Sequence, residues 1–215
     1  GVTGKATVFQ GGKSSKVKKG MEVGVGATIS TGLGTVTLNL GGHGIAIVQS
    51  RSTLTIEELS HKIVGGETQG RTKFDLKQGI LLGNVKKTSA ASNYEVKTAK
   101  GVAGIRGTTY EIHAVGIFKC GEGMYTVQLL VTDPATNQLQ VITLQPTTQL
   151  DAQGAVAEVL NLTPAQAQAL NNAVDPLLQD PNVSGVIVVP KTQIEATITG
   201  TVGKVRVEQR NVIVE

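Results

Sequence analysis

The chain has 215 residues, which is enough for one large or two small domains, and its 40% of hydrophobic residues can fill a substantial core. Aromatic residues make up only 3%, so few side chains could stack on sugars or bases. The net charge is only +4, and neither nucleic-acid nor carbohydrate binding is indicated. Cys120 is the only cysteine, which excludes an internal disulfide and a four-cysteine zinc site.

The N-terminal part carries a lysine cluster at residues 13–19, next to a glycine pair. Gly12-Lys13-Ser14 is similar to the end of a phosphate-binding loop, but that motif requires a glycine where Thr7 stands. With one aromatic residue nearby, the lysines are interpreted as a solvated loop and the glycines as a turn.

Alternation with a period of two residues dominates the rest of the chain. Apolar and polar residues alternate over 35–40, 53–56 and 194–199, which predicts half-buried strands. Two further strands are expected at 125–131 and 138–144, joined as a hairpin by a turn-rich linker. Glycine-rich breaks at short spacing favour a mainly β fold, a jelly-roll-like β-sandwich, over alternating strands and helices.

Residues 101–112 set three glycines and an arginine into a strand-forming apolar run. A glycine inside a strand pattern marks a bulge, a bend or a close backbone approach, so a corner is predicted before the strand resumes. Arg106 could tie strand carbonyls together or dock an anionic group of a partner, and the structural role is favoured. The structural signature comprises Gly101, Gly104, Arg106, Gly107 and Thr108.

One short helix is expected after Thr163. This residue can cap the helix with Pro164 in the first helical position, and Gln166 completes a capping box. Apolar residues follow at helical spacing, and Pro176 or Pro181 should stop or kink the helix.

Candidate catalytic and metal-binding patterns are lacking. The histidines, His43, His61 and His113, are far apart in sequence and have no partner at ligand spacing, so each is interpreted as a surface or rim residue. Cys120 follows a lysine and could have a lowered pKa, or could be a buried structural thiol. The expectation is therefore that the chain is not an enzyme and uses no cofactor, metal or small-molecule substrate.

The runs at 31–40, 52–56, 76–80 and 94–98, followed by the signature segment, occur in the order seen in the FecR-domain family. The chain resembles that family from about Val17 to Ile112. The resemblance implies an extracytoplasmic, non-catalytic domain. Some known members pass a signal from an outer-membrane receptor to a sigma factor through a membrane-spanning segment, but no window here approaches the roughly 18 apolar residues of a span.

The expected organisation is a FecR-like β domain over 1–118 and a β-plus-helix extension over 119–215, which can share one core. The chain opens on Gly1 rather than methionine, which predicts a mature periplasmic, cell-surface or secreted protein whose signal peptide has been removed.

Two functions are considered, and in both the chain binds other proteins or copies of itself. The first is a structural or self-assembling cell-surface subunit that forms a homo-oligomer or filament through β-strand contacts. The alternative is a sensory or scaffold domain of FecR type that relays an envelope signal to a heterologous partner. At least one terminal segment, residues 5–9 or 204–214, is expected to pair as a strand with another subunit or to close a sheet edge of its own body. Deleting 211–215 should then either stop assembly, which favours the first function, or destabilise the monomer, which favours an internal strand.

Overall fold

The computed structural model describes residues 1–40, 43–64, 67–86, 92–132, 139–154, 156–179, 186–188 and 191–193. Within these residues the chain forms two ten-stranded β-sheets and one α-helix, which confirms the mainly β, sandwich-like prediction. Sheet A consists of β1 (Val2–Thr3), β4 (Glu22–Val23), β6 (Thr35–Asn39), β7 (Gly44–Val48), β10 (Ile80–Val85), β13 (Thr109–His113), β14 (Ile117–Cys120), β17 (Thr148–Asp151), β18 (Glu158–Asn161) and β19 (Val186–Val188). Sheet B consists of β2 (Ala6–Gln10), β3 (Lys13–Lys16), β5 (Thr28–Thr31), β8 (Thr53–Val64), β9 (Glu67–Gln78), β11 (Asn93–Lys97), β12 (Gly101–Arg106), β15 (Met124–Thr132), β16 (Leu139–Leu144) and β20 (Lys191–Gln193).

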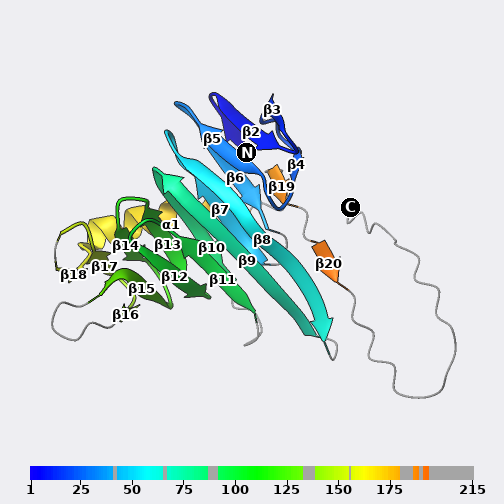
Figure 1. Cartoon of the computed structure of the whole chain (residues 1–215). Helices are drawn as coiled ribbons and strands as arrows, with labels where there is room; N and C mark the ends of the chain where they lie inside the picture. Colours follow the sequence, from blue (N-terminus) through cyan, green and yellow to red (C-terminus); the bar gives the residue numbers. More distant parts are fainter. Residues whose placement is uncertain are drawn as a thin grey trace, which may run out of the picture.

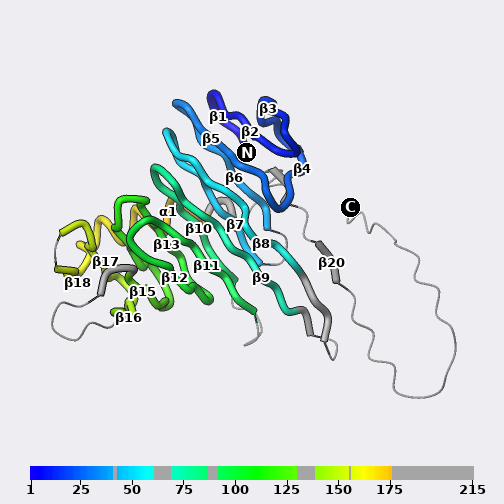
Figure 2. Tube along the Cα trace, in the orientation of Figure 1, coloured from blue at the N-terminus to red at the C-terminus, as the bar shows by residue number. Residues whose placement is uncertain are grey.

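Both sheets are built at the same time as the chain advances. The pair β6 and β7 lies in sheet A, β8 and β9 lie in sheet B, β10 returns to sheet A, and the same alternation continues to β17 and β18. The N-terminal strands therefore lie at one end of the sandwich and β14 to β18 at the other, as the colour gradient in Figures 1 and 2 shows. Most neighbouring strands are antiparallel, whereas β11 pairs with β9 in parallel.

The strands form because their side chains alternate between core and solvent. In β5 and β12, for example, every second residue is buried. The expected hairpin is confirmed by the antiparallel pairing of β15 with β16. The β2–β3 hairpin turns at Gly11 and Gly12, both with positive φ, so the phosphate-loop-like glycine belongs to a turn.

One buried hydrophobic cluster runs from Ala6 to Ala152 and includes residues on both sides of position 118. Phe74 and Tyr94 meet edge to face, with ring centroids 5.8 Å apart. Both sides of the predicted domain boundary therefore contribute to one core, and the boundary after residue 118 stays a prediction.

Helix α1 (Pro164–Gln179) covers part of the outer face of sheet A (Figure 1). The capping box is confirmed, because Thr163 Oγ1 accepts from the Gln166 amide at 3.3 Å and Gln166 Oε1 accepts from the Thr163 amide at 2.9 Å. Pro176 lies within the helix, which ends at Gln179, before Pro181. A second buried cluster joins the helix to sheet A, and its members are Ile45, Ile47, Leu82, Leu170 and Val174.

The predicted terminal strands have different outcomes. The N-terminal one is β2, which pairs with β3 and β5 inside its own sheet. The predicted strands at 194–199 and 204–214 lie outside the described residues.

Candidate interaction surface

The signature segment carries the chain from one sheet to the other. β12 ends at Arg106 in sheet B, and β13 begins at Thr109 in sheet A. Gly107, between them, has φ of +61°, a left-handed conformation that side chains with a Cβ rarely adopt. The crossover thus depends on a glycine at this position.

Thr108 fixes the crossover from inside. Its side chain is 1% exposed, and Oγ1 lies 3.0 Å from the Arg106 carbonyl oxygen and 2.9 Å from that of Met124, as a donor to these carbonyls. Its backbone amide and carbonyl both pair with Val85, each at 3.0 Å. One residue therefore connects β12, β15 and the end of β10.

The remaining signature residues lie on β12. A Cβ at Gly101 would come within 2.9 Å of the Gln128 carbonyl oxygen, so this glycine allows β15 to approach closely. Gly104 and Arg106 point to the outer face of sheet B. The Arg106 side chain is exposed and lines a small cleft with His43, but it makes no hydrogen bond or ion pair within the described residues. The expected tie between strand carbonyls is therefore not seen there.

Two tyrosines connect the sheets through the core. The hydroxyl of Tyr94 in sheet B lies 2.6 Å from that of Tyr110 in sheet A. Burial raises the pKa of both hydroxyls well above 10, so they remain protonated and hydrogen-bonded. Gly83 makes room for this pair, because a Cβ there would lie 2.5 Å from the Tyr110 hydroxyl oxygen and 2.6 Å from the Ile45 carbonyl oxygen.

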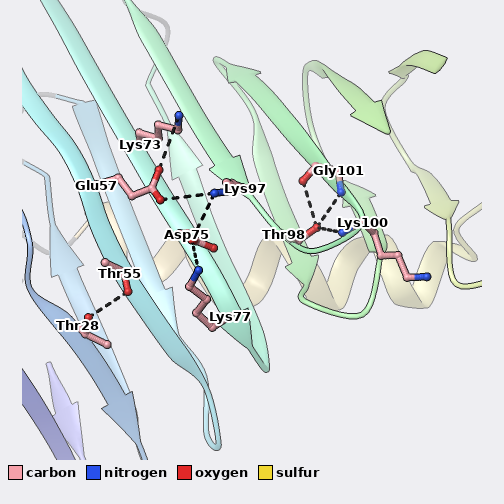
Figure 3. Close-up of polar contacts among 10 residues, drawn as sticks. All are labelled: Thr28, Thr55, Glu57, Lys73, Asp75, Lys77, Lys97, Thr98, Lys100 and Gly101. Atoms are coloured by element: carbon pink, nitrogen blue, oxygen red, sulfur yellow. Dashed lines mark hydrogen bonds and ion pairs between the residues drawn. The ribbon is translucent and has the colours of Figure 1, made fainter. Parts of the chain in front are cut away.

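The outer face of sheet B is a broad polar surface. Near its N-terminal end, Thr28 and Thr55 join hydroxyls at 3.1 Å across β5 and β8. In the middle, five charged side chains from β8, β9 and β11 form what we call the charged ladder (Figure 3). Its members are Glu57, Lys73, Asp75, Lys77 and Lys97.

Strand register explains the charged ladder. Asp75 lies opposite Lys97 of β11, and its carboxylate is 2.5 Å from Lys77 Nζ and 3.7 Å from Lys97 Nζ. The two lysines cover it, and its side chain is 6% exposed although it faces outward. A bulge in β8 between Ile56 and Glu58 brings Glu57 within 3.7 Å of both Lys73 and Lys97. Because the lysines are substantially exposed, such pairs add little stability, and the main effect is a fixed pattern of charge.

A second polar cluster lies on β13 and β14 of sheet A. His113 Nε2 and Lys119 Nζ are each 2.6 Å from Glu111 Oε1. Burial alone would raise the pKa of Glu111, but the hydrogen bonds and charges of His113 and Lys119 outweigh it and hold the pKa below its ordinary value.

The other histidines differ from this one. His43 is 7% exposed and its ring fills the space that a Cβ of Gly70 would need, so it is buried at the small cleft and is not a surface histidine. The side chain of His61 is not among those that the structure describes.

Cys120 is a buried thiol. Its sulfur lies 3.4 Å from the Gly123 carbonyl oxygen, and burial raises its pKa to about 12. The structure thus supports the interpretation as a structural thiol and not that as a reactive thiolate. Among the described residues, no cluster of histidine, cysteine and carboxylate side chains is placed to hold a metal ion. In that same part of the chain, no helix has the length and hydrophobicity needed to cross a membrane.

Within the described residues, these features define a mainly β, two-sheet domain in which the outer face of sheet B is polar. The family model described as FecR protein matches residues 27–119, which confirms the resemblance: the chain carries a FecR domain over the central strands β5 to β14.

The fold is also similar to that of solved structures. A crystal structure of a candidate anti-sigma factor from Parabacteroides distasonis ATCC 8503 has 12% sequence identity and a TM-score of 0.50, over 66% of this chain and 63% of that one. Another crystal structure, of a candidate anti-sigma factor from the same organism, has 12% identity and a TM-score of 0.43, over 63% of this chain and 62% of that one. This chain therefore matches less than two thirds of these neighbours' lengths, and at such identity the first similarity concerns the fold alone. No curated protein matches the chain.

Proposed function

We propose that the chain is a non-enzymatic, extracytoplasmic sensory domain of FecR type that relays an envelope signal by binding a heterologous protein. The observation that carries this proposal is the FecR match over residues 27–119, which covers the signature crossover and all five members of the charged ladder. The candidate anti-sigma factor with a similar fold is consistent with it.

The outer face of sheet B is the surface we assign to the partner. Helix α1 packs on part of the outer face of sheet A and does not cover the charged ladder on sheet B (Figures 1 and 3). A fixed pattern of lysines and carboxylates on paired strands can select a partner with the complementary pattern and speed its approach. The expected partner is a folded envelope protein with alternating charges on its contact surface.

The alternative, a self-assembling surface subunit, depends on strand edges and not on this face. Variants of the face therefore separate the two functions. A photo-crosslinking amino acid placed at Thr126, an exposed residue on the outer face of β15, should give a discrete adduct with a different protein in the source cells. The matched control is the same amino acid at Leu33, which is 81% exposed in the bend between β5 and β6 and belongs to no strand of sheet B.

The double variant Lys73→Glu, Lys97→Glu should abolish the adduct at Thr126 while the chain stays folded, because it reverses the charge of two of the three lysines in the charged ladder. Adducts at Thr126 that contain only copies of this chain, or that match those at Leu33, would contradict the proposal.

A further inference from the structure

The two ends of the sandwich differ in how their edge strands are protected. At the N-terminal end, β4 has only two residues, and β3 carries Lys13 and Lys16 on its exposed edge. Short strands and lysines are the usual means by which proteins prevent edge-to-edge pairing. This end is therefore blocked against strand addition.

The opposite end lacks this protection in sheet B. Among the described strands, β16 is the last of that sheet, it has six residues, and none is charged. Leu139 and Val141 on it are 45% and 64% exposed. In sheet A, the edge strand β18 likewise exposes Val159 and Leu160, at 52% and 48%. An uncharged, apolar edge of this length is a template for a further strand.

The chain contains a segment of matching sequence beyond its last described strand. Val205 and Val207 alternate with Lys204, Arg206 and Glu208, the pattern of a strand with one buried and one wet face. Added beside β16, such a strand would place its valines next to the partly buried Ile142. Lys204, Arg206 and Glu208 would then lie beside the exposed Leu139 and Val141, which their aliphatic stems can cover.

The position of β20 indicates which edge this segment can reach. β20 pairs with β8, on the opposite side of the sandwich from β16 and β18 (Figure 1). Five strand spacings separate β8 from β16 in sheet B, a distance of about 24 Å. Residues 194–203, which connect β20 to this segment, span at most about 33 Å when fully extended. Bringing the segment to the β16 edge of the same copy would therefore use most of that length. A donor that leaves one side and an acceptor on the other are the arrangement of a head-to-tail contact between copies.

We propose that residues 204–214 of one copy add as a strand to the β16 edge of a second copy. The contact uses the end of the sandwich and leaves the charged ladder free, so it goes beyond the proposed signalling function and does not depend on it. Since the two contacting surfaces differ, each copy can donate to one neighbour and accept from another.

Light scattering coupled to size-exclusion chromatography tests this contact with the purified chain. The mass of the full chain should rise with concentration from 22.3 kDa to at least twice that value. The variant Val141→Lys, which blocks the acceptor, and a chain without residues 204–215, which lacks the donor, should each stay monomeric. Ser15→Lys, which adds a lysine to the already protected β3 edge, is the matched control and should assemble like the full chain.

The decisive step is a mixture of the two blocked chains. One retains the donor and the other the acceptor, so they should form a one-to-one dimer that a peptide of residues 203–215 displaces. A full chain that stays monomeric at all concentrations would overturn the proposal, and so would assembly that survives the deletion. A monomer whose melting temperature falls on deletion would show instead that the segment closes its own edge.

Discussion

Replacing Gly107 by valine tests the crossover most sharply. Gly107 has φ of +61°, and a β-branched residue in this conformation costs about 1–3 kcal/mol. The chain cannot relax easily, because Thr108 beside it is 1% exposed and hydrogen-bonded to β10, β12 and β15. For a protein of this size each kcal/mol lowers the melting temperature by about 2–4 °C, so Gly107→Val should lower it by about 2–12 °C.

The assay is thermal unfolding followed by circular dichroism, with Gly107→Asn as the matched control. Asparagine tolerates the left-handed conformation better than other non-glycine residues, so its loss should be clearly smaller. Equal melting temperatures for the valine variant and the unchanged chain would refute the role assigned to Gly107.

The remaining predictions concern the core and the polar clusters. Gly83→Ala should destabilise the chain and disturb the Tyr94–Tyr110 pair, since the new Cβ would lie 2.6 Å from the Ile45 carbonyl oxygen; tyrosine near-ultraviolet circular dichroism reports it. Thr108→Val should cost about 1–3 kcal/mol in urea unfolding, because it removes the hydroxyl donor to two carbonyls, and a cost near zero would contradict the assignment. Since the pKa of Glu111 is lowered from 4.5 in the folded chain, its ionised carboxylate stabilises the fold above pH 4.5, and this contribution is lost as the pH falls through the folded pKa. Glu111→Gln should therefore flatten the stability profile in that acidic range, and an unchanged profile would show that the cluster contributes nothing. Cys120 should resist iodoacetamide at pH 8 in the native chain and react once the chain is unfolded in urea, whereas rapid native labelling would contradict its burial.

Much of the fold could be predicted from local pattern. Residues 35–40 and the hairpin of β15 and β16 follow from period-two alternation, and the capping box at Thr163 marks the start of α1. These signals lie within a few neighbouring residues, so the sequence displays them directly. The glycines of the signature segment likewise indicated a corner.

The polar clusters could not be predicted in this way. Asp75 and Lys97 are distant in sequence and meet only through the parallel register of β9 with β11. The position of Glu57 depends on a bulge that shifts the β8–β9 register. In the sequence, Glu57 is only one of two adjacent glutamates, and nothing local indicates which of them faces the lysines. His43 was interpreted as a surface or rim residue because nothing local shows that Gly70, on β9, leaves space for its ring. Alternating outward charges in neighbouring strands were the one available signal.

Gene expression in the source organism tests the signalling function most directly. Transcripts would be compared by RNA sequencing in the unchanged strain, in a strain lacking this chain, and in one carrying Lys73→Glu, Lys97→Glu at normal protein abundance. A relay that acts through the charged ladder predicts that the deletion and the charge reversal alter the same defined set of transcripts in the same direction. If the deletion alters no such set, or the charge-reversed strain is indistinguishable from the unchanged one, the chain does not relay a signal through this surface.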